Sequence, residues 1–166
     1  MKFISTRGEA PDLDFADVIL TGLASDGGLY VPESLPEVSL KTLRQWQNLS
    51  YEDLALEVMW PFVEGSMPRE TFEKMVVDAY SSFRHRAIAP TKQLSHDTWL
   101  LELFHGPTLA FKDFALQLLG RLLDYFIAEA GYHGVVIGAT SGDTGSAAIE
   151  GARHSDSLDI VILHPY

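Results

Sequence analysis

The sequence predicts an α/β protein in which a mainly helical first region precedes the beginning of a parallel sheet. Two short apolar runs, residues 134–138 and 158–163, lie on either side of a segment with helical spacing at residues 144–152. A strand, a helix and a strand in this order are typical of a parallel sheet with a right-handed crossover. Since an open sheet of this kind needs more strands, we expect the fold to be incomplete within these 166 residues.

Apolar residues recur at helical spacing through residues 1–98, which we expect to form a first, mainly helical domain. The expected elements are helices at residues 15–24, at residues 40–49, after Ser50 and at residues 69–83, with an extended segment at residues 29–32. Ser50 with Asp53 resembles a capping box, and Pro61 is expected to end the helix that they begin. Pro68 suits the first position of the last helix.

The second region, residues 99–166, is expected to contain the first part of the sheet. Its expected elements are strands at residues 99–104, 134–138 and 158–163, and helices at residues 111–130 and 144–152. The run at residues 134–138 is apolar with a glycine at each end, which favours a buried strand.

The composition is typical of a globular protein and excludes several classes of site. There is no cysteine, so disulfides, thiolate metal sites and cysteine nucleophiles are excluded. The formal net charge of −11 disfavours nucleic acid and anionic membranes as partners, and no apolar run is long enough to span a bilayer. The histidines show no metal-ligand spacing, so we expect no metal site. No signal peptide is expected, and the chain fits a cytoplasmic protein.

The most informative residue is Lys112, near the end of the run ELFHGPTLAFKD at residues 102–113. Residues 106–108, Gly-Pro-Thr, predict a tight turn at the start of a helix. A lone lysine is ordinarily a solvated charge, but Lys112 lies in an apolar stretch between Phe111 and Phe114. The positive end of the helix dipole also disfavours an ammonium, and imine formation needs a neutral amine.

The second motif is the glycine-rich run GATSGDTGSAA at residues 138–148. Backbone N–H groups at the start of a helix bind carboxylates and phosphates, and the hydroxyls of Thr140, Ser141 and Thr144 add donors. The run lacks the patterns of a nucleotide P-loop and of a dinucleotide-binding loop, and a capped tight turn is the alternative interpretation. An amine beside an anion site suggests chemistry on an amino acid held by a pyridoxal cofactor.

Together the two motifs resemble those of threonine synthases. Residues 104–113 are similar to the family's cofactor-lysine signature, and residues 139–145 are similar to its substrate loop. The runs ISTRG at residues 4–8 and DGGLYVP at residues 26–32 are similar to its opening segments. The resemblance covers the whole chain and implies the fold of fold-type II pyridoxal-phosphate enzymes, which is that of the tryptophan synthase β subunit. Residues 99–166 would then be the first part of the catalytic region.

The resemblance implies the last step of threonine biosynthesis, in which O-phospho-L-homoserine and water give L-threonine and phosphate. Lys112 would hold pyridoxal 5'-phosphate covalently and then carry protons among the α, β and γ carbons of the substrate. Thr140, Ser141, Gly142, Asp143 and Thr144 would hold the substrate α-carboxylate. Asp143 would also approach the 3-oxygen of the cofactor, where related enzymes have an asparagine and where a carboxylate donates only if it is protonated.

Three further residues are given structural or open interpretations. His105 suits a structural hydrogen bond as well as it suits catalysis. Asp113 is expected to cap the helix or to pair with a cation. Arg7 could reach a phosphate, although an exposed or salt-bridged arginine is the more ordinary outcome.

Complete threonine synthases continue well past this length, so we expect an N-terminal fragment that is inactive alone. Its exposed strand edges would favour self-association. Three alternatives stay open: a threonine-synthase-like phospho-lyase acting on a related substrate, a non-catalytic binding or assembly module, and a phosphate-binding α/β domain without pyridoxal.

Overall fold

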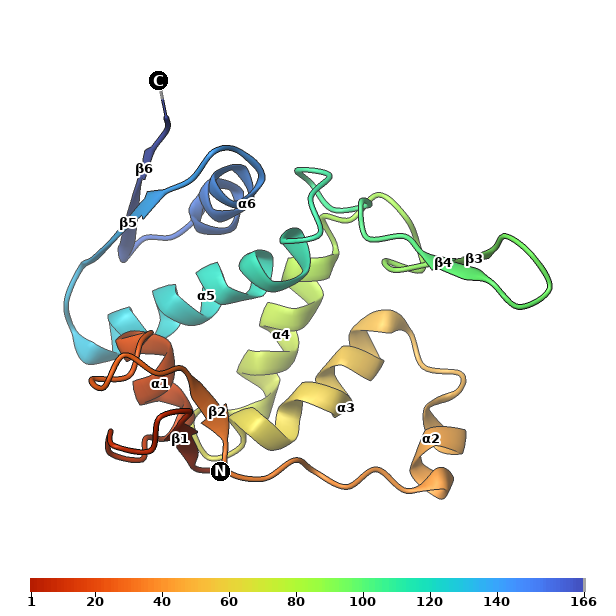
Figure 1. The fold of residues 1–166 in the computed structure, drawn as a ribbon, viewed down its shortest axis with the longest axis horizontal. Coiled ribbons are helices and arrows are strands. Elements are labelled where there is room, and N and C mark those ends of the chain that lie inside the picture. Colours follow the sequence, from red (N-terminus) through yellow and green to blue (C-terminus); the bar gives the residue numbers. More distant parts are fainter. Residues whose placement is uncertain (166) are drawn as a thin grey trace. The chain divides into compact units, whose positions relative to one another are not determined.

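The computed structural model describes residues 1–165, which form two compact units. The first unit comprises residues 1–74, and the second begins at Met75. Figure 1 shows the helices and strands of each unit in chain order. The expected division at residue 98 stays a prediction, since it concerns the domains of a larger α/β fold.

In the first unit a short antiparallel sheet precedes a set of helices. Strand β1 (Phe3–Ser5) pairs with β2 (Tyr30–Pro32), and helix α1 (Phe15–Thr21) lies between them in the chain. Helices α2 (Leu40–Trp46), α3 (Tyr51–Val63) and α4 (Arg69–Tyr80) follow, and α4 continues into the second unit. The core of the first unit includes Val63 and Phe72, which are 2% and 0% exposed.

A side-chain cap fixes the beginning of α3. The Ser50 hydroxyl accepts a hydrogen bond from the Asp53 N–H at 3.0 Å and donates one to the Asp53 carboxylate at 2.8 Å. The predicted cap is therefore present. The prediction that Pro61 ends this helix is wrong, because α3 continues to Val63. Pro61 lies in the last turn, where its missing N–H removes only one helical hydrogen bond.

The second unit contains a hairpin and a strand–helix–strand unit. The hairpin consists of β3 (Thr91–Gln93) and β4 (Trp99–Leu101). The long helix α5 (Asp113–Ala130) leads to β5 (Gly134–Ala139), α6 (Asp143–Ala152) and β6 (Leu158–Leu163). Strands β5 and β6 run parallel, with Gly134 opposite Leu158, so the predicted strand–helix–strand unit is confirmed.

Helices α5 and α6 contact one face of the β5–β6 sheet. A Cβ built on Gly134 would overlap a side chain of α5, and one built on Gly145 of α6 would lie 3.0 Å from Ile162 of β6. The opposite face carries Val135 and Ile137, which are 57% and 71% exposed. The expectation of a buried strand at β5 is therefore wrong for this face, because no described segment covers it.

The predicted α/β fold class is confirmed, although two strands were missed. Strands β1 and β3 are only three residues long, which is too short for a periodic pattern to show in the sequence. Strand β4 ends at Leu101 rather than at residue 104. Within residues 1–165, no helix combines the length and the apolar character needed to cross a bilayer.

Candidate functional site

The Lys112 motif forms a loop that leads into α5. The predicted turn is present at Gly106, Pro107 and Thr108, where the Leu109 N–H donates to the Gly106 carbonyl at 3.2 Å. Leu109 has a φ of 65°, a left-handed conformation that is uncommon for residues other than glycine. Lys112 occupies the cap position with φ −65° and ψ −18°, so it continues smoothly into the helix.

The Lys112 amine has no hydrogen bond or ion pair within residues 1–165. Its side chain is half-buried, and Nζ lies 4.4 Å from the centroid of the Phe111 ring. Contact with the face of an aromatic ring holds a cation without consuming a donor. The amine is therefore available to another group.

Asp113 fastens the turn to the helix. Its side chain is 0% exposed and accepts hydrogen bonds from the Thr108 N–H at 2.9 Å and the Thr108 hydroxyl at 2.8 Å. A Cβ on Gly106 would overlap the Asp113 side chain, so only glycine fits there. These contacts give Asp113 a structural role and fix the path of the chain on both sides of Lys112.

The glycine-rich run connects β5 to α6, as predicted. The Thr140 hydroxyl oxygen accepts hydrogen bonds from the N–H groups of Gly142, at 3.2 Å, and Gly145, at 3.1 Å. The Gly142 N–H, one of the groups expected to bind an anion, is thus occupied within the loop. The N–H groups of Asp143 and Thr144, in the first turn of α6, have no partner among residues 1–165, and both residues are exposed.

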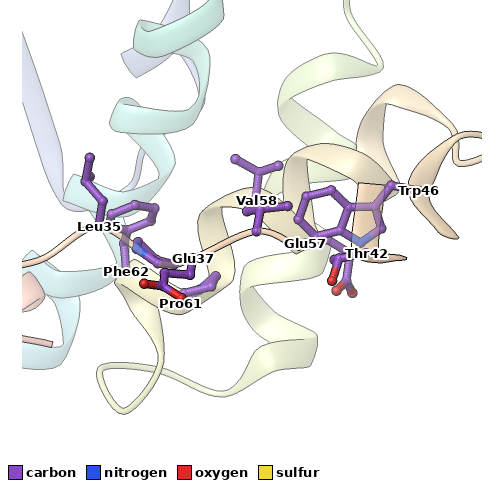
Figure 2. Close-up of a pocket in the computed structure, with 10 residues that line it drawn as sticks. Leu35, Glu37, Thr42, Trp46, Glu57, Val58, Pro61 and Phe62 are labelled. Carbon is purple, nitrogen blue, oxygen red and sulfur yellow. The ribbon is translucent and has the colours of Figure 1, made fainter. Parts of the chain in front are cut away.

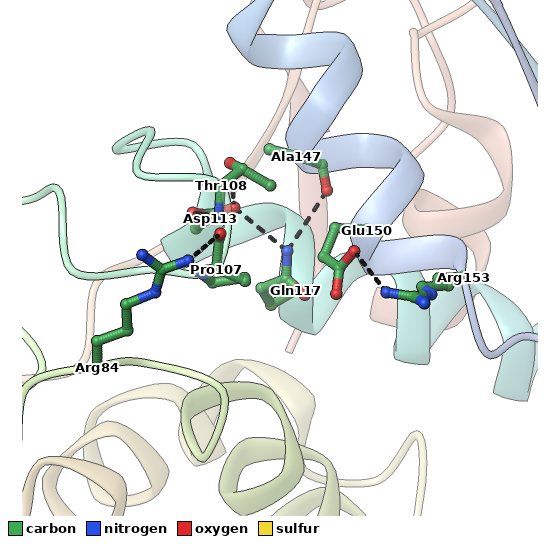
Figure 3. Close-up of polar contacts among 8 residues, drawn as sticks. All are labelled: Arg84, Pro107, Thr108, Asp113, Gln117, Ala147, Glu150 and Arg153. Carbon is green, nitrogen blue, oxygen red and sulfur yellow. Dashed lines mark hydrogen bonds and ion pairs between the residues drawn. The ribbon is translucent and has the colours of Figure 1, made fainter.

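A buried amide joins the two motifs. The side chain of Gln117, 3% exposed, donates from Nε2 to Asp113 Oδ1 at 3.3 Å and to the Ala147 carbonyl at 3.4 Å. Figure 3 shows the resulting line of contacts from Thr108 through Asp113 and Gln117 to α6. Hydrogen bonds thus connect the beginning of α5, next to Lys112, with the second turn of α6, which follows the loop at residues 140–144.

Sequence reasoning missed Gln117 and two glycines that bring α5 and α6 together. A Cβ on Gly120 would overlap the carbonyl oxygen of Gly151, and a Cβ on Gly151 would overlap the carbonyl oxygen of Leu116. A signal was present for Gly120, because an isolated glycine within a helical pattern often marks close packing. Nothing in the sequence distinguishes Gln117 from an exposed polar residue of a helix.

His105 makes the structural contact that the sequence left open. Its Nε2 lies 2.8 Å from Glu102 Oε2, and its ring centroid lies 4.8 Å from that of His85. Arg84 holds the same turn, since its guanidinium donates to the Pro107 carbonyl at 3.3 Å. The ring of His105 is thereby fixed beside the Lys112 loop.

In the first unit Arg7 belongs to a loop network around Asp26. Its guanidinium donates to the Asp26 carbonyl at 2.8 Å. The Asp26 carboxylate accepts from the Gly28 N–H, the Ser5 hydroxyl and the N–H groups of Glu9 and Ala10. These hydrogen bonds, that from Gly28 above all, lower the pKa of Asp26 below its ordinary value.

The first unit also contains an apolar groove that holds none of the predicted site residues. It lies between residues 35–38, α2 and α3 and has a volume of about 380 Å³. Figure 2 shows Leu35, Trp46, Val58 and Phe62 along it. No group of three or more histidine, aspartate or glutamate side chains within residues 1–165 could hold a metal ion.

The known proteins that this chain resembles include several threonine synthases. Residues 2–80 match the family model described as the threonine synthase N terminus. All 166 residues align with a threonine synthase of Pseudomonas aeruginosa at 60% identity. A crystal structure of PLP-bound threonine synthase from Brucella melitensis superposes on 99% of the chain with a TM-score of 0.96, at 52% identity. The chain corresponds to the N-terminal region of threonine synthases.

The threonine synthase relatives are much longer than this chain. The chain spans 35% of the Pseudomonas aeruginosa protein and 36% of the Brucella melitensis chain. The whole chain also aligns with a threonine synthase-like 2 protein of Xenopus laevis at 42% identity, and it covers 35% of that protein. The resemblance seen in the sequence is confirmed over the whole chain.

Proposed function

We propose that this chain provides the lysine and the carboxylate-binding loop of a pyridoxal-phosphate-dependent threonine synthase. The reaction would convert O-phospho-L-homoserine and water to L-threonine and phosphate. The observation that carries the proposal is the junction of α5 and α6, where Gln117 ties the Lys112 motif to the glycine-rich run through buried hydrogen bonds. The similarity to threonine synthases over the whole chain supports it.

The groups around Lys112 fit pyridoxal 5'-phosphate, which carries a carbonyl that an amine attacks. Lys112 Nζ has no competing hydrogen bond within residues 1–165, and Phe111 offers it only the face of a ring. When bound, the cofactor withdraws electrons from the substrate. Lys112 Nζ would move protons among the α, β and γ carbons of the substrate.

The loop before α6 would hold the substrate by its α-carboxylate. The N–H groups of Asp143 and Thr144 lie in the first turn of α6, where the helix dipole favours an anion. Thr140, Ser141 and Thr144 would add hydroxyl donors. Gly142 has no side chain to obstruct the approach, and a Cβ built there would meet nothing within 4 Å.

Asp143 would have a second role beside the cofactor. We propose that its exposed carboxylate approaches the 3-oxygen of pyridoxal 5'-phosphate, the position that an asparagine takes in related enzymes. A carboxyl group donates a hydrogen bond only when it is protonated. The Asp143 carboxyl group and the 3-oxygen of the cofactor would therefore share one proton.

The experiment that tests the function uses the protein at its natural full length. L-Threonine and inorganic phosphate are measured after addition of O-phospho-L-homoserine, with pyridoxal 5'-phosphate present. Lys112→Ala should lower the rate by at least about 100-fold, because it removes the proton-transferring amine. Lys92→Ala changes an exposed lysine of β3 and is the matched control. Full activity of Lys112→Ala, or no threonine from the unmodified protein, would contradict the proposal.

A threonine-synthase-like phospho-lyase is the second candidate. The chain is 42% identical to the threonine synthase-like 2 protein of Xenopus laevis and 40% identical to a threonine synthase of Schizosaccharomyces pombe. The Lys112 motif serves either reaction, so identification of the organic product decides between them. Release of phosphate together with a product other than threonine would favour the phospho-lyase.

Two further proposals concern the cellular location of the protein and the association state of this polypeptide. The threonine synthase function would place it in the cytoplasm. The isolated 166-residue polypeptide would self-associate, because the apolar face of the β5–β6 sheet is exposed. Neither a metal ion nor a nucleic acid has a part in the proposed reaction.

A further inference from the structure

We propose that Gln117 is a positioning residue, which sets the Lys112 amine in register with the loop at residues 140–144. The inference rests on the proposed function, since it concerns the alignment of that site. It assigns a purpose to a buried polar cluster, Asp113 with Gln117, that neither the lysine chemistry nor carboxylate binding requires.

The side-chain nitrogen of Gln117 and both carboxylate oxygens of Asp113 are hydrogen-bonded to specific partners. Nε2 donates to one atom of α5, Asp113 Oδ1, and to one atom of α6, the Ala147 carbonyl oxygen. The two Asp113 oxygens also accept from Thr108. No buried side-chain nitrogen or oxygen within residues 1–165 lacks a partner. A completely satisfied buried network specifies one arrangement of the elements that it joins.

Stability alone does not call for an amide at position 117. Leu118 and Leu122 are buried on the same helix, and a side chain of similar volume without polar atoms would fill the space of Gln117. An apolar residue would fill the space but would form no directional bond between the two helices. The amide instead prefers the single register that places Ala147 at its donor.

The contact between Gly120 and Gly151 brings α5 and α6 close together but does not by itself specify their register. Gly120 and Gly151 let the backbones of α5 and α6 approach closely, but they offer no directional bond. Gln117 lies one turn before Gly120, and Ala147 lies one turn before Gly151. The hydrogen bond from Gln117 therefore fixes the helices on the side of the contact nearest to Lys112.

The consequence is a short rigid path between the two halves of the site. Lys112 adjoins Asp113, and the carbonyl that Gln117 holds belongs to the second turn of α6, directly after the loop. A misplacement of about 1 Å between reacting groups lowers a rate by up to about 100-fold. Loss of the Gln117 bonds should therefore lower kcat.

The test compares Gln117→Met with Gln45→Met in the protein at its natural full length. Methionine keeps the volume of glutamine and removes its hydrogen bonds, and Gln45 is an exposed glutamine of α2. We expect Gln117→Met to lower kcat for O-phospho-L-homoserine by about 10- to 100-fold. The KM should change less than kcat, and the urea midpoint should stay close to that of the unmodified protein.

Two further measurements separate positioning from simple support of the fold. Amide hydrogen exchange should rise in residues 104–112 and 140–146 of Gln117→Met and in no other segment. Asp113→Asn disturbs the same network, so the double variant with Gln117→Met should lose less activity than the product of the two single losses.

If the unmodified protein makes threonine and Gln117→Met keeps its kcat within about 2-fold, far less than the loss expected for a misplaced reacting group, the positioning role is wrong. It is also wrong if hydrogen exchange at the two segments is unchanged, or if kcat falls only in proportion to the unfolded fraction. If the unmodified protein makes no threonine, the proposed function fails first and the positioning role fails with it.

Discussion

Gly120 of α5 and Gly151 of α6 pack backbone against backbone, since a Cβ on either residue would overlap a carbonyl oxygen of the facing helix. Glycine within a helix is about 1 kcal/mol less favourable than alanine. The close approach of the two helices offsets that cost, because it brings Gln117 within hydrogen-bonding distance of the Ala147 carbonyl. The helix contact and the candidate site thus depend on the same two glycines.

We predict that Gly120→Ala destabilises the protein despite the higher helix propensity of alanine. The added methyl group meets a backbone oxygen, which cannot rotate away, so the helices must separate. Overpacking of this kind typically costs about 1–3 kcal/mol. Urea unfolding measures the change, and Ala115→Ser, which adds one atom at an exposed position of α5, is the control. A Gly120→Ala variant as stable as the unmodified protein would show that the helices tolerate separation.

The second prediction concerns the Asp26 network and acid. Hydrogen bonds, first of all that from the Gly28 N–H, lower the pKa of Asp26 below its ordinary value of 3.8. The carboxylate therefore stabilises the folded state fully above pH 3.8, and this contribution is lost as the pH falls below that value. Asp26→Asn should lower the urea midpoint at pH 7 and weaken its dependence on pH in the acid range. Asp12→Asn, at an exposed aspartate, should do neither.

The third prediction tests the cap of α3. Ser50→Ala removes the acceptor for the Asp53 N–H and should lower the free energy of unfolding by about 1 kcal/mol. Ser34→Ala, at an exposed serine outside the helices, is the matched control and should change it by less than about 0.5 kcal/mol. Equal stability of the two variants would mean that water replaces the Ser50 hydroxyl without loss.

Local signals explain why much of the fold could be predicted from the sequence. The turn at Gly106 and Pro107, the cap at Ser50 and the strand–helix–strand unit at residues 134–163 each depend on residues close together in the chain. Turn and cap residues act through their immediate neighbours, so their effects are visible before any tertiary contact is known. Pro61 misled the prediction because its position in the last turn, which decides its cost, was not known.

The candidate site was predictable only in part. Lys112 and residues 140–144 stand out as motifs, but the bond that joins them spans 30 residues, from Gln117 to Ala147. The pairing of β1 with β2 is similarly distant in the chain. Contacts of this kind depend on how helices and strands pack, and a single sequence carries no direct record of them. Their residues therefore looked ordinary until the fold was known.

The fourth prediction concerns the exposed face of the β5–β6 sheet. Ile137 lies opposite Val161, and the two are 71% and 46% exposed. Parallel sheets are ordinarily covered on both faces, so this apolar face should drive association of the isolated 166-residue polypeptide. Sedimentation equilibrium should show a mass that rises with concentration, and Ile137→Lys should return it toward the 18.4 kDa monomer. Leu40→Lys adds the same charge at an exposed leucine of the first unit and should leave the association unchanged. A polypeptide that stays monomeric at about 100 μM, where exposed apolar patches commonly cause association, would show that the face is stable in water.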